Sequence, residues 1–233
     1  WAEYFGRGIV HPVDDFRPSN PPTNAALLDA LARYFIDHDF DLKDLMHTIM
    51  QSEVYQLSSQ FNEYNVGDTQ NFSRSYRRRL PAEVMLDAVC DVTGTRDALP
   101  GVSTGGRAIE AWNNKLNSIF LDAFGRPPMN VDCPCDRDTS SNMVQALHMM
   151  NSTELQARIA DAKGRASRLI EQQDLTVRDI LSELYLSAYS RYPTDEEIVA
   201  VSQVLERRSV DRQTATEDIL WSLLNSAEFV YNH

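Results

Sequence analysis

The sequence contains no apolar run as long as the roughly 18 residues that a membrane-spanning helix needs, and no secretory apolar core. It also lacks a cationic excess, because 22 Lys and Arg face 34 Asp and Glu, a formal net charge of -12. That balance argues against general binding to nucleic acid or to anionic membrane, since both need a cationic face. We therefore expect no nucleic-acid partner and no membrane span in this sequence. Because the first residue is Trp1 and not Met, we expect a C-terminal piece of a larger multidomain protein.

Cysteine is scarce, and the three present are Cys90, Cys133 and Cys135. An odd number of cysteines argues against a fold stabilised by a framework of disulfide bonds. The redox state of all three cysteines stays open. The sequence has no Gly-x-Ser-x-Gly elbow, so Ser152 and Ser226 resemble nucleophiles only superficially and suit helix ends better.

Alternating strand patterns are missing too, whereas apolar residues recur at helical spacing over most of the chain. The pattern predicts a single all-α domain over residues 1–233, with about eight to ten helices and related helical hairpins near each end. Two long loops separate the helices, one over 95–108 and one after Gly125, and loops of this length are more often functional than accidental. Residues 56–73 are polar and rich in Asn, which indicates irregular structure.

Helix starts can be predicted from capping residues. Asp41 is the expected N-cap of the second helix, and Pro81 suits the first turn of a helix that runs to Val92. Another helix is expected over 111–124. Capping boxes are predicted at Thr176/Asp179, Thr194/Glu197 and Thr214/Glu217.

One phrase returns along the chain. Met149-Met150-Asn151-Ser152-Thr153-Glu154-Leu155 is echoed by Leu223-Leu224-Asn225-Ser226-Ala227-Glu228-Phe229, and more loosely by Ile49-Met50-Gln51-Ser52-Glu53-Val54-Tyr55. Phe5-Gly6-Arg7 likewise returns as Phe124-Gly125-Arg126. We interpret the first and last hairpins as relics of one helical unit, with convergence of capped amphipathic helices as the alternative.

A set of phrases spread from the first residue to the last resembles the domain of unknown function 1553 family, common in planctomycetes and related bacteria. The phrases are Trp1-x-x-x-Phe5-Gly6-Arg7-Gly8-Ile9-Val10, Asp14-Asp15-Phe16-Arg17, Ser52-x-x-Tyr55, Arg78-Arg79-Leu80-x-x-Glu83, Phe124-Gly125-Arg126, Gln145-Ala146-Leu147, Leu184-Tyr185-Leu186, Arg191-x-Pro193-Thr194 and Leu224-Asn225-Ser226-x-Glu228-Phe229. Each phrase is weak alone, and the set is specific.

The resemblance implies a position near the C-terminus of a large exported protein, after a companion domain and often a cytochrome c-like domain. It therefore implies an extracytoplasmic location, periplasmic or in the cell envelope, with the upstream companion domain as partner and haem in the neighbourhood. Sulfatase-like proteins in neighbouring genes point to polysaccharide use. The family has no established activity, so it supplies no catalytic residues. The chain has no Cys-x-x-Cys-His, so it is not expected to attach haem itself.

Two segments could hold a metal or an acid–base pair. His11, Asp14 and Asp15 lie together, and imidazole and carboxylates at short spacing can converge on one cation. Alternatively, the aspartates fix the loop by accepting backbone N–H groups and by pairing with Arg17. Cys133 and Cys135, one residue apart, could hold a soft metal or form a redox pair.

His148 and Cys90 are the nearest residues in the sequence that could join the cysteine pair as metal ligands. An orthodox zinc site would want a second close pair of ligands. The alternative is that the thiols pack a loop, or that one pairs with Cys90. Apart from a metal in this loop, we expect no cofactor in the domain.

Arg77, Arg78 and Arg79, with Arg74 before them, form the only dense basic run. Guanidinium groups can bind sulfate or carboxylate bidentately, so an acidic polysaccharide is a conceivable ligand. The alternative is that the run pairs with Glu83, one helical turn further on, and with Asp87.

The leading hypothesis is a non-catalytic docking module of a larger exported protein, linked to electron transfer or polysaccharide use. The alternative is a hydrolytic or redox enzyme domain. Its site would join the loop of His11, Asp14 and Asp15, or the Cys133/Cys135 loop, to the arginine run, with Glu83 as a further catalytic candidate.

Overall fold

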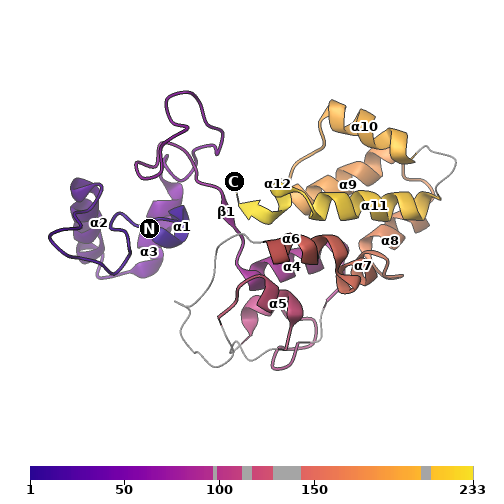
Figure 1. Cartoon of the computed structure of the whole chain (residues 1–233), viewed down its shortest axis with the longest axis horizontal. Coiled ribbons are helices and arrows are strands. Elements are labelled where there is room, and N and C mark those ends of the chain that lie inside the picture. Colours follow the sequence, from indigo (N-terminus) through magenta and orange to yellow (C-terminus); the bar gives the residue numbers. More distant parts are fainter. Residues whose placement is uncertain (97–98, 112–116, 128–142, 206–210, 233) are drawn as a thin grey trace. The chain divides into compact units, whose positions relative to one another are not determined.

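The computed structural model describes residues 1–96, 99–111, 117–127, 143–205 and 211–232. The chain divides into two compact units, Trp1–Arg78 and Arg79–Asn232. The described residues form twelve α-helices and one two-stranded sheet, which confirms the all-α prediction (Figure 1). They exceed the expected eight to ten helices partly because two are single turns of four residues, which periodicity does not reveal. The single-domain organisation stays a prediction.

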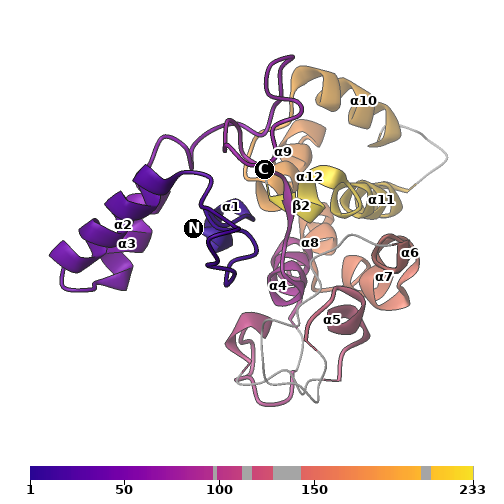
Figure 2. The same ribbon diagram turned by 60° about the vertical axis from the view of Figure 1, so that its left-hand side comes forward.

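The first unit contains helices α1 (Ala2–Phe5), α2 (Ala25–Asp37) and α3 (Leu42–Gln51). Helices α2 and α3 form the predicted hairpin and lie side by side in both views (Figures 1 and 2). Asp41 is the N-cap of α3, as predicted: its Oδ1 accepts from the backbone N–H groups of Lys43 and Asp44, at 2.9 and 3.1 Å.

The core of the first unit is small. Phe5, Ile49 and Phe72 form its buried cluster, and the Trp1 ring stacks on Phe5 at 4.2 Å between centroids. Residues 56–73 form no helix or strand, as predicted. Side-chain hydrogen bonds hold this segment instead. Asp68, for example, accepts from Ser73 and from three backbone N–H groups, and these bonds keep the pKa of Asp68 well below its usual range.

The second unit holds the remaining helices. They are α4 (Ala82–Thr93), the 3-10 helix η1 (Ala108–Glu110), α5 (Ile119–Ala123), α6 (Met143–Asn151), α7 (Thr153–Ile159), α8 (Arg165–Glu171), α9 (Val177–Tyr189), α10 (Asp195–Leu205), α11 (Arg212–Leu224) and α12 (Ala227–Val230). Strand β1 (Arg78–Arg79) leads into this unit, and β2 (Tyr231–Asn232) pairs with it. Next to this pair, the Leu80 N–H donates to the Val230 carbonyl at 3.3 Å.

Helices α4 and α11 organise the core of the second unit. Helix α4 packs against α5, α7, α8 and α9, and α11 packs against α7, α8, α9 and α10. Their fully buried side chains include Met85, Leu86, Val89, Leu220 and Leu224. None of the described helices combines the length and the apolar character that crossing a bilayer requires.

Most of the predicted helix starts are confirmed. Thr176 and Asp179 exchange hydrogen bonds as a capping box, and so do Thr194 and Glu197. The predicted box at Thr214/Glu217 is wrong. Helix α11 begins earlier, because the Asp211 carboxylate caps it by accepting from the N–H groups of Gln213 and Thr214.

The helix expected over 111–124 is shorter in its described part. Helix α5 begins only at Ile119, because the Ser118 hydroxyl caps it by accepting from the Leu121 N–H at 3.3 Å; residues 112–116 lie outside the described part. The expected helix from Pro81 to Val92 is confirmed as α4.

The repeated Phe-Gly-Arg phrase is a helix end in both copies. Gly6 and Gly125 follow α1 and α5 with φ of 73° and 77°, a left-handed conformation that glycine adopts without steric cost. The preceding phenylalanines, Phe5 and Phe124, are both buried. The phrase therefore ends a helix and places an aromatic ring in the core.

Candidate functional site

The N-terminal loop is held by its own side chains. The Asp15 carboxylate pairs bidentately with Arg17, at 2.5 Å to Nε and 2.7 Å to Nη2. The Asn20 amide donates to the carbonyl groups of His11 and Asp15, and the side chains of His11 and Asp14 are exposed. Of the structural interpretation of the loop, the pairing of Asp15 with Arg17 is present, and a catalytic or metal role for His11, Asp14 and Asp15 stays a prediction. Within the described residues, no three His, Cys, Asp or Glu side chains gather as metal ligands.

The three arginines of the basic run have different surroundings. Arg77 is exposed, Arg78 donates to the Glu3 carbonyl within the first unit, and Arg79 donates to the Phe124 carbonyl at 2.9 Å within the second. Arg78 and Arg79 thus each donate to a backbone carbonyl group, and binding of an acidic ligand by this run stays a prediction.

The two acids considered as partners of this run lie on α4. Glu83 is half-buried in the first turn, where its charge suits the positive end of the helix dipole. Asp87 is buried and binds another segment of the second unit. It accepts from the N–H groups of Ala108 and Ile109, at 2.6 and 3.1 Å, and so anchors η1 to α4.

Of the predicted metal ligands, Cys133 and Cys135 lie outside the described residues. His148, on α6, lies with its ring edge-on to Phe120 and Phe124, at 5.4 and 6.2 Å between centroids. Burial lowers its pKa. Cys90 is buried on α4, and its Sγ accepts from Arg158 Nη1 at 3.4 Å. The metal hypothesis for this loop stays a prediction.

The repeated phrase around Ser152 and Ser226 is a joint between two helices. In both copies a helix ends, the serine hydroxyl accepts an N–H three residues on, and a short helix follows. The acceptor distances are 3.3 Å for Ser152 and 3.1 Å for Ser226. The looser copy differs, because the Ser52 hydroxyl donates to the Ile49 carbonyl and no helix follows. The serines cap helices, as the sequence indicated.

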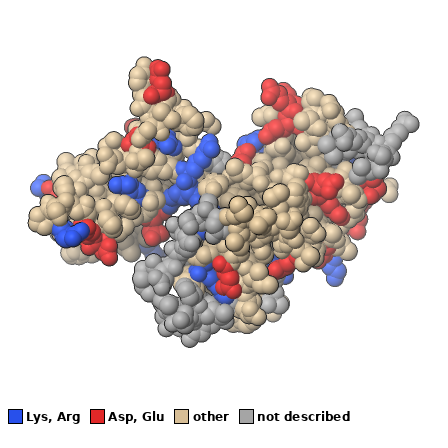
Figure 3. Space-filling view, in the orientation of Figure 1, with Lys and Arg blue, Asp and Glu red and all other residues tan. Residues whose placement is uncertain are grey.

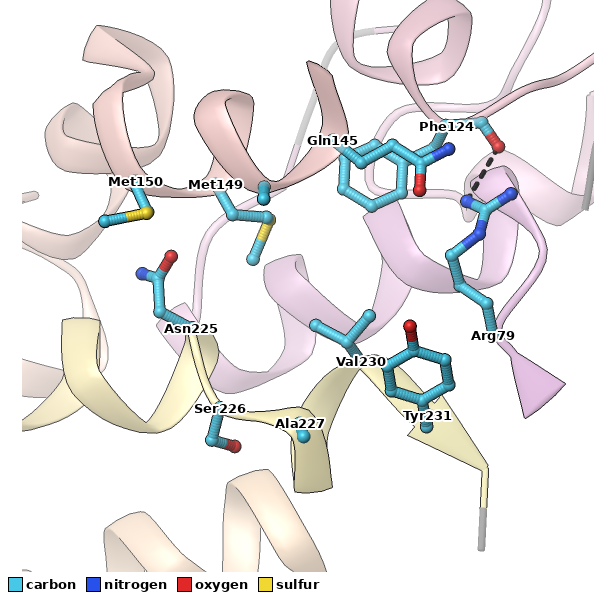
Figure 4. Close-up of a pocket in the computed structure, with 11 residues that line it drawn as sticks. Arg79, Phe124, Gln145, Met149, Met150, Asn225, Ser226, Ala227, Val230 and Tyr231 are labelled. Carbon is cyan, nitrogen blue, oxygen red and sulfur yellow. Dashed lines mark hydrogen bonds between the residues drawn. The ribbon is translucent and has the colours of Figure 1, made fainter. Parts of the chain in front are cut away.

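Both copies of this joint line one pocket of about 280 Å³ in the second unit (Figure 4). The first copy contributes Met149 and Met150, at the end of α6. The second contributes Asn225 and Ser226, between α11 and α12, and Ala227, the first residue of α12. The full lining is Arg79, Phe124, Gln145, Ala146, Met149, Met150, Asn225, Ser226, Ala227, Val230 and Tyr231.

The pocket has a cationic end. Figure 4 draws the Arg79 guanidinium and the Gln145 amide at one end, and the thioethers of Met149 and Met150 at the other. Arg79 is held there by its hydrogen bond to the Phe124 carbonyl and by its position over the Phe124 ring, 5.6 Å from the centroid. The Arg79 guanidinium group thus lies at one end of the pocket, beside an apolar wall.

Sequence reasoning did not identify this pocket, although it noted the residues that form it. The repeat around Ser152 and Ser226 was the available signal, because both copies meet at the pocket. What the repeat could not show is that α6 and the α11–α12 joint come together in space.

The sequence profile of the PSD1 family, described as protein of unknown function (DUF1553), matches residues 1–205. The chain belongs to this family. The matched region includes the first copy of the serine joint, and the second copy lies beyond it. No curated protein and no solved structure matches the chain.

Proposed function

We propose that the chain is a non-catalytic interaction module whose α2/α3 hairpin docks a partner protein. The partner is the companion domain expected upstream in the same exported polypeptide. One observation carries this proposal: the rest of the first unit leaves the apolar side of the hairpin uncovered.

The exposed side of the hairpin is unusually apolar. None of the residues of α2 is buried, and Ile49 alone is buried on α3. Ile36, Phe40 and Leu42 are 57, 65 and 56% exposed near the turn between the helices. Met46 and Met50 continue from Leu42 at steps of four residues, so these three lie along one stripe of α3. Clustered exposed apolar side chains of this kind mark interaction sites.

The C-terminal hairpin, formed by α10 and α11, provides a comparison in which the apolar stripe is covered. Helix α11 buries six residues, Ala215, Thr216, Ile219, Leu220, Leu223 and Leu224, because α7, α8 and α9 pack on it. Helix α3 has a comparable apolar stripe and buries one residue. An amphipathic helix gains most of its stability by burying such a stripe. A covering partner would bury the apolar stripe of α2 and α3, as α7, α8 and α9 bury that of α11.

Charge indicates what the partner surface should look like. Residues 25–51 hold five aspartates against Arg33 and Lys43, and three of the aspartates, Asp37, Asp39 and Asp41, surround the exposed turn. Complementarity of potential favours a partner with an apolar centre and a basic rim.

A concave surface of the first unit adjoins the hairpin. A pocket of about 480 Å³ lies between the two helices and the segments that carry Trp1 and Phe72. Leu27, Leu31 and Val54 supply apolar walls. A side chain from the partner could anchor there, since binding energy concentrates where a side chain fills a pocket.

The extracytoplasmic setting, the haem-bearing neighbours and the acidic polysaccharide remain expectations from the family resemblance. The enzyme alternative, with the His11 loop or the arginine run in its site, also stays a prediction.

The test is a titration of the purified upstream companion domain into this chain by calorimetry. Ile36→Asp and Phe40→Asp place charge on the exposed apolar turn, and we expect each to weaken binding about tenfold or more. Val199→Asp is the matched control, because Val199 is 61% exposed on α10 of the second unit. We expect it to bind as the wild type does.

Equal binding of all variants would overturn the proposal, and so would no binding by the wild type. Sedimentation of the chain alone provides the second check. A dimer that Phe40→Asp dissociates would replace the companion domain by a second copy of the chain as occupant, and would also overturn the proposal.

A further inference from the structure

We infer that the pocket between the α2/α3 hairpin and the segments that carry Trp1 and Phe72, the hairpin pocket, binds a tryptophan side chain of the partner protein. This inference rests on the proposed docking function, because the hairpin forms much of the pocket wall, and it names the side chain that anchors the partner. The residues that line the hairpin pocket belong to the first unit.

The volume of the hairpin pocket favours a large side chain. A dry cavity of ~150 Å³ holds one benzene molecule in a well-studied case. The hairpin pocket, at about 480 Å³, is roughly three times as large. It therefore has room for the two fused rings of an indole, whereas a leucine side chain would leave much of it unfilled. Tryptophan is also among the residues that most often dominate the binding energy of an interface.

The inner part of the hairpin pocket is apolar. Ile49 and Phe72 line it and are buried in the core of the first unit, and Leu31 and Val54 pack against that core. Leu27, half-buried on α2, adds a further apolar wall. These walls favour an apolar ring, because the free energy gained on burial is roughly proportional to the apolar area removed from water.

The rim of the hairpin pocket is polar and uncharged. Its exposed lining residues are Thr23, Asn24, Gln70 and Asn71, and no Lys, Arg, Asp or Glu is among the described residues that line the pocket. Figure 3 shows, at the left of the view, that most of the visible surface of the first unit is also uncharged. A charged side chain of the partner would lose water in the pocket without finding a counter-charge, which costs free energy. The pocket therefore favours a neutral side chain.

Three hydroxyl groups that line the hairpin pocket already donate their protons within the chain. The hydroxyls of Thr23 and Ser52 donate to backbone carbonyl groups, at 3.0 and 2.6 Å, and the Thr48 hydroxyl donates to the Tyr34 hydroxyl at 3.0 Å. Because a hydroxyl has one proton and two lone pairs, each of these oxygens can only accept a further hydrogen bond. The indole N–H of tryptophan is a donor and never an acceptor, so it complements these oxygens.

The first experiment is an NMR titration of the chain labelled with ¹³C at its isoleucine, leucine and valine methyl groups. The probes are indole and benzofuran, which has the same shape and no hydrogen-bond donor. We expect indole to cause saturable shifts of the Ile49 and Val54 methyl signals, while those of Ile180, in the second unit, stay constant. Benzofuran should bind about fivefold more weakly, because it cannot donate to the hydroxyl oxygens. p-Cresol, the side chain of tyrosine, fills less of the pocket and should also bind more weakly than indole.

The second experiment connects the hairpin pocket to the partner. Leu27→Trp fills the pocket from its own wall, and we expect it to abolish indole binding and to weaken binding of the companion domain about tenfold. Leu28→Trp is the matched control, because Leu28 is the next half-buried leucine of α2 and is not part of the pocket lining. It should bind both as the wild type does. If Leu27→Trp fails to fold, competition replaces it: saturating indole should weaken binding of the companion domain to the wild type.

Any of four results would overturn the tryptophan anchor. They are an absence of saturable shifts at Ile49 and Val54, equal affinity for indole and benzofuran, tighter binding of p-cresol than of indole, and binding of the companion domain that neither Leu27→Trp nor indole weakens.

The failure of the anchor and the failure of the docking function give different results. If Ile36→Asp and Phe40→Asp weaken binding of the companion domain but Leu27→Trp and indole do not, the docking function stands and the anchor is wrong. If the wild type binds indole but not the companion domain, the docking function is wrong, and the partner's tryptophan is excluded with it.

Discussion

The Arg191 side chain joins three helices of the second unit, α9, α10 and α12. Its guanidinium pairs bidentately with Glu197 on α10, at 2.8 and 2.9 Å, and with Glu228 on α12, at 2.6 and 2.9 Å. It also lies over the rings of Tyr185 and Tyr189 on α9, at 5.4 Å from each centroid. Two bidentate carboxylates on one guanidinium form a network, which stabilises more than an isolated surface pair.

This network predicts a pH dependence of stability. The hydrogen bonds from Arg191 are the main reason why the pKa of Glu197 falls from 4.5 to about 2. Because the folded-state pKa is the lower one, Glu197 stabilises the fold fully above about pH 4.5, and this contribution is lost as the pH falls towards 2. Glu197→Gln should lose about 1 kcal/mol of unfolding free energy at pH 7, a value that allows for solvent screening. The difference from wild type should shrink below pH 4.5, as measured by urea denaturation.

Glu196→Gln is the control for this series, because it removes the same charge from the same turn of α10 and Glu196 is exposed. A constant difference between Glu197→Gln and wild type from pH 7 to pH 2 would contradict the assignment to the Arg191 pair.

At the scale of elements, the serine joint lets the chain turn between two helices without leaving N–H groups unsatisfied. In the second copy the Ser226 hydroxyl caps α12 and also accepts from the Tyr189 hydroxyl, at 2.8 Å. Ser152 caps α7 alone. The joint therefore links α11 to α9 as well as to α12.

Replacing the capping serines should destabilise the second unit. We expect Ser152→Ala and Ser226→Ala each to cost about 1 kcal/mol of unfolding free energy, since each removes an N-cap. Ser226→Ala should cost more, because Tyr189 also loses an acceptor. Ser52→Ala, in the copy that caps no following helix, should cost less than either. Thermal and urea denaturation followed by circular dichroism measure these changes, and equal costs at all three positions would refute the capping role.

Much of this local structure could be predicted from residue types. Asp41, Thr176 and Thr194 start helices because their oxygens accept N–H groups close in sequence, which a reader of the sequence can foresee. The prediction for Thr214 was wrong because Asp211, three residues earlier, accepts from the Gln213 and Thr214 N–H groups, so Thr214 already lies inside the helix. The pocket could not be foreseen, because it depends on the packing of segments far apart in the sequence.

At the scale of the whole molecule, the two units differ in how much they bury. The buried cluster of the first unit consists of Phe5, Ile49 and Phe72, whereas that of the second extends over α4 to α12. Hydrophobic burial is the dominant favourable term in folding. The first unit by itself should therefore be the less stable of the two.

Native-state hydrogen exchange tests this expectation on the chain alone. We expect the amides of α3 to open with a free energy at least about 2 kcal/mol below that of α4 and α11, because few apolar contacts hold α3. Equal protection of α3 and α11 would contradict it. If the companion domain is added and covers the hairpin, protection of α3 should rise while that of α4 stays constant.

The hydrogen bond from Leu80 to Val230 has a consequence for biosynthesis. Helix α4 leaves the ribosome well before α11, which completes the buried core, and before the Val230 carbonyl. Until then the apolar face of α4 has no final cover, and such exposed surface is prone to aggregation. The growing chain must consequently be shielded while the residues between α4 and α11 are translated, and a prematurely terminated product lacking α11 and α12 would be a substrate for proteolysis.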